Sequence, residues 1–397
     1  MTIHVVTIWR RELVNVNKTR DNHLARFGQH FDHTLLVRKD KTIASHIESY
    51  GTRVHHISPG LFGLLGFWVK ALWWLRTNHA KMKIDAVVFP IGEEPVILPA
   101  RYLLGNGASR PRLLLDLWDV PGLALEGSDQ SPIKSMMRKL YLGLLPTMLK
   151  TGHIVISGVV NKPFLNMGIS SDKIIETENG VNTDVFKPVE QTAKIWLKLP
   201  ARKEKTIRLL YQGYIHEARG SLAMVQMVSD LRKLGYDMQL LLVGPTESNQ
   251  IKLIETLSIE SDVAQYVLTH ENIDSKEIPA VISDADICLC PLANIEKFRW
   301  SYPVKIYEYM AMGKVVVASK LPGIDRMITS KSVGGCLFDP ADFNNMTDSV
   351  KWLIENPEEH KDIAKRGMEH AKNKSWDFIV RTLANNIETR IALQRAG

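Results

Sequence analysis

The amino-acid sequence predicts an α/β protein with two parallel-sheet domains. Short apolar runs of strand length alternate with longer helical patterns along almost the whole chain, as in successive βαβ units. The alternation stops between residues 188 and 205, where prolines and charges are typical of a linker, and then restarts. The length of 397 residues also suits two domains. We therefore expect a first domain over residues 1–187 and a second over residues 206–375.

The first series of elements begins with residues 3–8, an apolar and largely β-branched run that predicts a buried strand and not a signal peptide. Similar runs predict the later strands, and longer periodic segments predict helices. The expected strands are 34–37, 53–57, 86–90, 112–117 and 154–157, and the expected helices are 19–29, 44–50, 61–75, 132–150 and 161–167. Asn179 and Gly180 then indicate a tight turn.

The second series repeats this alternation after the linker. Its expected strands are 208–212, 238–244, 267–268, 285–291 and 315–318, with an edge strand in 334–339. Its expected helices are 222–234, 250–257, 275–284, 303–313, 341–355, 357–372 and 376–396. Pro322 and Gly323 predict a turn after the strand 315–318.

The helix predicted to start near Pro303 has the most informative local pattern. Ser301 is expected to cap it, Pro303 to lie in its first turn and Gly313 to end it. Lys305 and Glu308 are three residues apart and therefore share a face. The N–H groups of a helix start attract phosphate, Lys305 adds positive charge, and Glu308 can accept hydrogen bonds from sugar hydroxyls. The same pattern also fits a surface helix with a solvated lysine and glutamate.

The composition and charge of the chain limit the classes of molecule that it is expected to bind. A net charge of +7 and a pI of about 9.1 favour polyanions, phosphate-bearing substrates or an anionic membrane face. Nucleic acid is disfavoured, because no basic run is interleaved with aromatic residues and no zinc-finger pattern occurs. The three cysteines form neither a disulfide framework nor a metal pattern, which fits a reducing cytosol.

Residues 61–75 are the most apolar stretch and contain three tryptophans beside Lys70 and Arg76. At fifteen residues the stretch is shorter than the ~20 needed to span a bilayer. Two interpretations stay open: a buried helix of an α/β layer, and a helix lying in a membrane interface, with both compatible on different faces. The expected helix 132–150 has apolar residues opposite a basic face and allows the same two interpretations.

Carboxylates mark the ends of two expected strands. Asp116 lies within an apolar strand, where a carboxylate needs partners or a chemical task. Asp119 fits a turn before Pro121. Glu93 and Glu94 follow the strand 86–90 and form a second candidate acidic site.

Taken together, four segments between about residues 150 and 325 resemble the GT-B-fold, family-4-type retaining glycosyltransferases. The segments are Asn179-Gly180-Val181-Asn182 with Phe186, Gly213 with Arg219-Gly220, Asp284 to Pro291, and Pro303-x-Lys305-x-x-Glu308 through Gly313 with the valines after it. The resemblance implies two Rossmann-like domains facing across a cleft. It also implies that residues 376–397 cross back to the first domain.

The resemblance further implies a sugar transfer from a nucleotide-diphosphate sugar, linked to UDP or GDP, to a glycan or lipid-linked acceptor, with retention of anomeric configuration. Arg219 and Lys305 would stabilise the diphosphate, so that no metal or other cofactor is required. Glu308 would hold the ribose. Further donor contacts would come from Gly213, from the backbone at Ile273 near Asn272, and from the amides around Tyr302 and Val304.

The chain also departs from the family pattern. Trp300 stands where relatives usually have a glutamate eight positions before Glu308, and the first loop lacks the double glycine. Leu115 and Asp116 stand where many relatives have a histidine, which makes Asp116 the candidate catalytic or acceptor-orienting carboxylate. The carboxylates of Asp284 and Asp286 are interpreted as part of a helix end that enters a strand, not as a metal pair.

Three alternatives remain: a nucleotide-sugar epimerase of the same architecture, a nucleotide-sugar-binding protein without turnover, and a membrane-associated scaffold. The expected location is cytoplasmic, with peripheral contact to the membrane face through residues 61–75. The sequence leaves open the base, the sugar, the acceptor and the oligomeric state.

Overall fold

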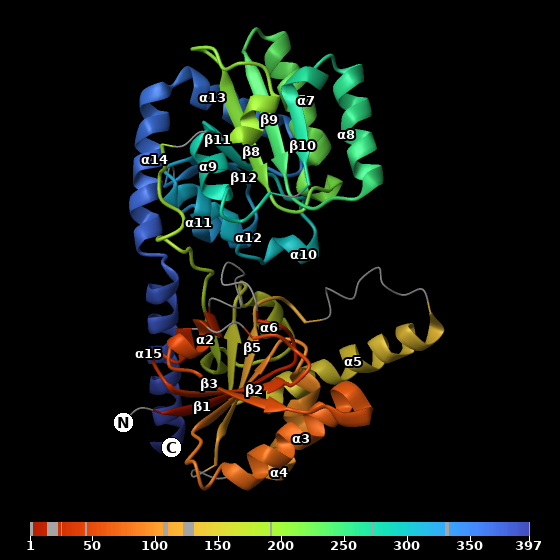
Figure 1. Ribbon diagram of the computed structural model, residues 1–397, viewed down its shortest axis with the longest axis vertical. Helices are drawn as coiled ribbons and strands as arrows, with labels where there is room; N and C mark the ends of the chain where they lie inside the picture. Colours follow the sequence, from red (N-terminus) through yellow and green to blue (C-terminus); the bar gives the residue numbers. More distant parts are fainter. Residues whose placement is uncertain are drawn as a thin grey trace. The chain divides into compact units, whose positions relative to one another are not determined.

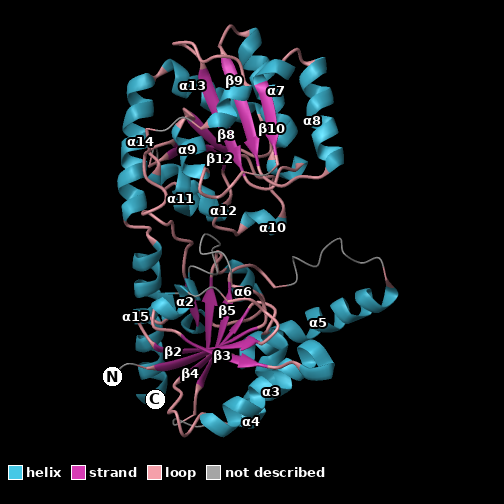
Figure 2. Ribbon diagram, viewed as in Figure 1, coloured by secondary structure: helices cyan, strands magenta, loops and turns pink. Residues whose placement is uncertain are grey.

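The computed structural model describes residues 3–13, 23–24, 26–43, 46–105, 110–121, 131–190, 193–271, 273–329 and 333–396. The chain forms two compact units, Met1–Asn179 with Trp376–Gly397, and Gly180–Ser375. Each unit has strands flanked by helices (Figure 2), so the predicted α/β class with two parallel sheets is confirmed.

The described part of the first unit has a sheet of seven parallel strands in the order β3-β2-β1-β4-β5-β6-β7. The strands are β1 (His4–Trp9), β2 (Asp32–Arg38), β3 (Arg53–Ile57), β4 (Ala86–Pro90), β5 (Arg112–Leu117), β6 (Ile154–Ser157) and β7 (Ile174–Glu176). Because β2 and β3 lie on one side of β1 and β4 on the other, the strand order reverses between β1 and β4. Open α/β sheets place ligands at the carboxyl ends of strands at such a point.

Helices cover this sheet (Figure 1). They are α2 (His46–Ser49), α3 (Gly63–Asn78), α4 (Ile97–Leu104), α5 (Pro132–Thr151), α6 (Lys162–Asn166) and α15 (Trp376–Ala396), with 3-10 turns η1 (Gly60–Phe62), η2 (Glu94–Val96) and η4 (Ser171–Lys173). Of the helix expected over residues 19–29, positions 23–24 and 26–27 are helical, and positions 19–22 and 25 lie outside the described residues. The start of the helix expected over 44–50 also lies outside them.

The last helix belongs to the first unit, as the resemblance implied. Trp376, Val380 and Leu383 of α15 are buried against Val88 and Leu114 of the sheet. Arg26 also donates a hydrogen bond from Nε to the Asp377 carboxylate at 2.6 Å. Burial of large apolar side chains, at about 1.5–3 kcal/mol each, holds this helix to the sheet.

The described part of the second unit has a sheet of six parallel strands in the order β10-β9-β8-β11-β12-β13. The strands are β8 (Ile207–Gln212), β9 (Met238–Val243), β10 (Val267–His270), β11 (Ile287–Cys290), β12 (Val315–Ser319) and β13 (Gly335–Phe338). The helices are α7 (Ser221–Lys233), α8 (Ser248–Glu260), α9 (Ile278–Ser283), α10 (Glu296–Arg299), α11 (Val304–Ala311), α12 (Pro322–Met327), α13 (Asn344–Glu355) and α14 (Pro357–Lys372), with η5 (Lys194–Lys198), η6 (Glu217–Arg219) and η7 (Ala264–Tyr266). Here the strand order reverses between β8 and β11.

Two local predictions in this unit are wrong. Pro322 and Gly323 begin helix α12 and do not form a turn, because proline suits a first helical position. Gly323 is needed there for a close approach, since a Cβ would lie 2.1 Å from the Ser301 carbonyl oxygen. Ser301 does not cap α11 either: its hydroxyl donates to the Phe298 carbonyl of α10, and Pro303 takes the N-cap position.

The segment expected to be a linker, residues 188–205, falls within the second unit, although positions 191 and 192 lie outside the described residues. Lys194–Lys198 forms the 3-10 turn η5, and Trp196 is fully buried. The Trp196 indole donates to the Val281 carbonyl at 3.0 Å. This anchor fixes the segment to α9.

Helix α3 has one buried face and one exposed apolar face. Phe67, Ala71 and Leu75 are buried, whereas other apolar side chains on η1 and α3 face solvent. The exposed ones are Leu61, Phe62, Leu65, Val69 and Trp73. No helix among the described residues is long and apolar enough to cross a membrane.

Candidate functional site

The candidate site of the second unit lies where β8 and β11 end. Gly213 follows β8 in a backbone conformation with φ of +132°, which favours glycine. A Cβ on Gly213 would lie 2.6 Å from the Lys305 ammonium nitrogen. The absence of a side chain at position 213 therefore lets Lys305 approach the end of β8.

Lys305 lies in the first turn of α11, and its amine is unusually placed. The Nζ atom is buried and has no hydrogen-bond partner among the described residues. It lies 4.0 Å from the centre of the Tyr211 ring, a cation–π contact. Because a buried ammonium without hydrogen bonds is costly, this arrangement favours binding of an anion.

Arg219 follows β8 in the chain, at the same end of the sheet. It ends η6, and Gly220 then adopts a left-handed conformation with φ of +73° at the start of α7. The Arg219 guanidinium lies 4.8 Å from the centre of the Phe298 ring. Burial raises the pKa of the Cys290 thiol at the end of β11, and Lys305 and Arg219 both oppose that rise. Both cations therefore act at the carboxyl end of β11.

Glu308 lies one turn deeper in α11 and is buried. Its Oε2 accepts a hydrogen bond from the Gln212 side-chain amide at 3.3 Å. Burial raises the pKa of Glu308 to about 7, while Lys305 and the Gln212 hydrogen bond oppose the rise. The carboxyl group is therefore poised between its neutral and charged forms near neutral pH.

The other predicted donor residues are spread more widely. Tyr302 is buried, and Val304 is half-buried at the first position of α11, where helix geometry leaves the first N–H groups without helical acceptors. Ile273 follows the edge strand β10, which β9 separates from β8. Asn272 lies outside the described residues.

Trp300, the departure from the family pattern, is mostly buried. Its indole donates a hydrogen bond to Glu296 Oε1 at 2.6 Å. A carboxylate therefore lies beside position 300, although it comes from four residues earlier in the chain.

In the first unit, Asp116 is buried near the end of β5 with two partners. The Trp118 indole donates to Oδ1 at 2.6 Å, and His23 Nε2 lies 3.4 Å from Oδ2. His23 is fully buried. Sequence reasoning missed His23, because it lies 93 positions before Asp116 and no spacing rule connects the two positions.

Glu93 and Glu94 lie at the point of strand-order reversal in the first unit. Glu93 accepts from the Trp68 indole of α3 and pairs with Arg10 Nε at 3.1 Å. Glu94 accepts from the Gly92 amide at 2.8 Å. Burial raises the pKa of Glu93 to about 7, opposed by Arg10 and Trp68. This acidic pair joins the loops after β1 and β4 to α3.

The carboxylates of Asp284 and Asp286 have structural partners. Asp284 accepts from the Ala193 amide at 2.7 Å, and Asp286 accepts from the Arg208 amide at 2.8 Å. Both residues lie in the connection between α9 and β11. Each carboxylate therefore ties this connection to a neighbouring segment of the second unit.

Comparison with known proteins points to one family. Residues 206–356 match the family model described as Glycosyl transferases group 1. The chain is 24% identical over 262 residues to the phosphatidyl-myo-inositol mannosyltransferase of Mycobacterium leprae. This match covers 65% of this chain and 65% of the mannosyltransferase. It is 24% identical over 232 residues to the lipopolysaccharide 1,2-N-acetylglucosaminetransferase of Salmonella typhimurium, covering 57% of this chain and 59% of the other. The matches thus span a little under two thirds of these relatives' length.

Solved structures are similar over nearly the whole chain. Sucrose-phosphate synthase from Thermosynechococcus elongatus superposes with a TM-score of 0.72 at 18% identity, covering 99% of this chain and 100% of the other. Anabaena HepE in complex with UDP and glucose superposes with a TM-score of 0.71 at 14% identity, covering 98% and 100%. At these identities the likeness establishes the fold.

Proposed function

We propose that this chain is a glycosyltransferase of group 1, because residues 206–356 match the model of that family and the chain has the GT-B fold. In this proposal it transfers a sugar from a nucleotide-diphosphate sugar to a glycan or lipid-linked acceptor with retention of anomeric configuration. The single observation that carries the proposal is the buried Lys305 ammonium, which lacks a hydrogen-bond partner among the described residues. A diphosphate oxygen would satisfy it.

The two cations have a chemical task in this reaction. As the bond between sugar and diphosphate breaks, negative charge develops on the leaving diphosphate. Lys305 and Arg219 stabilise that charge, and the free N–H groups at the start of α11 donate to the same oxygens. Stabilisation that increases in the transition state accelerates the reaction.

Glu308 gives the site its preference for a nucleotide. Its ionised carboxylate accepts two hydrogen bonds from the ribose hydroxyls, and Gln212 fixes its orientation. A uridine donor is favoured over a guanosine donor, because HepE, similar in fold, is described in complex with UDP and glucose.

Asp116 is the candidate acceptor-orienting carboxylate of the first unit. The Trp118 indole holds Oδ1 by a hydrogen bond, and His23 Nε2 lies 3.4 Å from Oδ2, so one oxygen of Asp116 is oriented before substrate binds. In this role Asp116 accepts a hydrogen bond from the attacking hydroxyl of the acceptor.

A lipid-linked acceptor is favoured by the exposed apolar face of η1 and α3, here called the α3 face: Leu61, Phe62, Leu65, Val69 and Trp73. Lys70 and Arg76 flank it, as suits an anionic membrane interface. Helix α5 adds exposed Met136, Met137 and Leu140. The mannosyltransferase relative is named for a phosphatidyl-myo-inositol acceptor. Peripheral contact with a membrane thus forms part of the proposal.

The test is release of nucleoside diphosphate from a panel of UDP- and GDP-linked sugars, with and without lipid vesicles. The proposal predicts slow donor hydrolysis without acceptor and faster release with an acceptor lipid. Binding without any release favours the nucleotide-sugar-binding alternative, and interconversion of the donor sugar, seen by NMR, favours the epimerase.

A further inference from the structure

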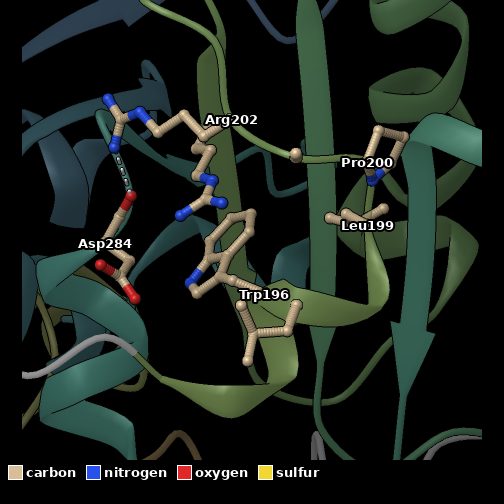
Figure 3. Close-up of a pocket in the computed structure, with 8 residues that line it drawn as sticks. Trp196, Leu199, Pro200, Arg202 and Asp284 are labelled. Carbon is tan, nitrogen blue, oxygen red and sulfur yellow. Dashed lines mark hydrogen bonds between the residues drawn. The ribbon is translucent and has the colours of Figure 1, made fainter.

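A pocket of about 490 Å³ lies in the second unit, lined by Trp196, Leu199, Pro200, Arg202, Arg208 and Asp284 (Figure 3). Arg208 is the second residue of β8, and Asp284 precedes β11. The pocket is thus at the amino-terminal edge of the sheet, whereas Gly213 and Lys305 lie at the carboxyl ends of the strands. It is a different place from the candidate donor site.

Arg208 is the central feature of this pocket. Only 6% of the residue is exposed. Its Nε donates to the Gln239 side chain at 3.3 Å, and its guanidinium lies 5.0 Å from the centre of the Trp196 ring. Among the described residues Arg208 forms no ion pair, and the bond from Nε is its one side-chain hydrogen bond. Burial lowers the pKa of Arg208 and neighbouring Arg202 lowers it further, while the Asp284 and Asp286 carboxylates raise it.

The other charged residues that line the pocket already contact groups of the protein. Arg202 pairs with Asp286 at 2.7 Å and donates to the Asp284 carbonyl at 3.4 Å, the contact drawn in Figure 3. The Asp284 carboxylate accepts from the Ala193 amide. In the described part of the chain, the arginine of this pocket without an ion-pair partner is therefore Arg208, whose guanidinium is a rigid fork that matches a carboxylate or a phosphate.

The rest of the lining is apolar. Figure 3 shows Leu199 and Pro200 across the pocket from Asp284, with Trp196 between them. Trp196 itself is fully buried and is held by its hydrogen bond to the Val281 carbonyl. A volume of this size suits a small metabolite, and pockets of that kind combine apolar walls with a few fixed polar groups.

We propose that this pocket binds a small organic anion, whose carboxylate or phosphate pairs with Arg208, beside the positive charge of Arg202, and whose apolar body packs against Leu199 and Pro200. The site does not depend on the proposed transferase reaction. Because Arg208 and Gly213 lie at opposite ends of β8, an anion here leaves the donor site open.

Calorimetry with the full chain tests this proposal, with phenyl phosphate and benzoate as probes and benzyl alcohol as the uncharged control. Uridine diphosphate is present in excess, so that the donor site does not contribute. We expect saturable one-to-one binding of at least one anion and none of the alcohol. Arg208→Gln should weaken it about tenfold or more, as expected for a lost charge-assisted hydrogen bond. Arg232→Ala, which removes an arginine paired with Asp237 outside this pocket, should leave it unchanged.

Three results would overturn the proposal: no saturable binding to the parent protein, equal binding of benzyl alcohol, or parent-like affinity in Arg208→Gln. Circular dichroism checks that this variant folds. If Arg208→Gln does not fold, the Arg202→Ala variant is measured instead, because Arg202 is more exposed. Several-fold weaker anion binding by Arg202→Ala would support the proposal, and unchanged affinity would contradict it. Binding of only phenyl phosphate or only benzoate assigns the site to phosphates or to carboxylates.

Discussion

The Lys305 ammonium lies 4.0 Å from the centre of the Tyr211 ring, with no hydrogen-bond acceptor among the described residues. The ring supplies a weak electrostatic contact, and the missing side chain of Gly213 leaves room beside the amine. Both features keep the lysine desolvated and available.

Gly213→Ala tests whether Lys305 needs the space that the missing side chain of Gly213 leaves. The added Cβ would lie 2.6 Å from Nζ and displace the amine, so we expect loss of uridine diphosphate affinity. Gly235→Ala is the matched control, because its φ is also positive but nothing lies within 4 Å of the added Cβ. Both variants should lose about 1–2 kcal/mol of stability from backbone strain. Equal nucleotide affinities of the two variants would contradict this role.

The raised pKa of Glu308 predicts that the free energy of unfolding depends on pH. Its folded pKa of about 7 lies above the usual 4.5, so the folded state holds the proton more tightly. The resulting stability is complete below about pH 4.5 and is lost as the pH rises through 7. Glu308→Gln should therefore raise the melting temperature relative to the parent more at pH 8 than at pH 5. The surface variant Glu255→Gln should show no such trend. If the melting-temperature difference between Glu308→Gln and the parent were the same at pH 5 and pH 8, the raised pKa of Glu308 would be refuted.

Asp116→Asn should separate binding from transfer. The amide cannot accept the acceptor proton, so we expect transfer to fall about one hundredfold, in the range of lost general-base catalysis. Nucleotide affinity, measured by calorimetry, should stay unchanged. Asp119→Asn, in the same segment, is the control and should transfer at nearly the parent rate. Full activity of Asp116→Asn would leave this carboxylate a structural role with His23 and Trp118.

The α3 face predicts membrane binding. Leu65→Glu combined with Trp73→Glu places two charges on exposed apolar positions, and flotation with anionic vesicles should fall sharply. Trp74 is a poorer target, because its ring packs 5.3 Å from the His55 ring. Trp352→Glu changes a half-exposed tryptophan of α13 and should float as the parent does. Unchanged flotation of the double variant would exclude α3 as the contact.

Much of the fold could be predicted, because buried parallel strands are short apolar runs. Ile287–Cys290 and Val315–Ser319 are both fully buried strands, near the predicted positions. Lys305 and Glu308 could be singled out because helical spacing sets their shared face.

Other features depend on contacts distant in sequence. No local rule brings His23 to Asp116, and Gly323 serves a close approach to Ser301 that only the folded chain shows. The segment 188–205 has the composition of a linker, yet Trp196 anchors it and lines a pocket. Local composition indicates a loop there but cannot reveal what the loop packs against.

Titration calorimetry of uridine diphosphate with the parent, Lys305→Ala and Lys365→Ala measures whether the buried Lys305 ammonium binds the diphosphate. Lys365 is an exposed lysine of α14 and controls for the loss of one positive charge. If Lys305 binds the diphosphate, Lys305→Ala weakens binding about tenfold or more, while Lys365→Ala binds as the parent does. A folded Lys305→Ala variant with parent-like affinity would contradict it.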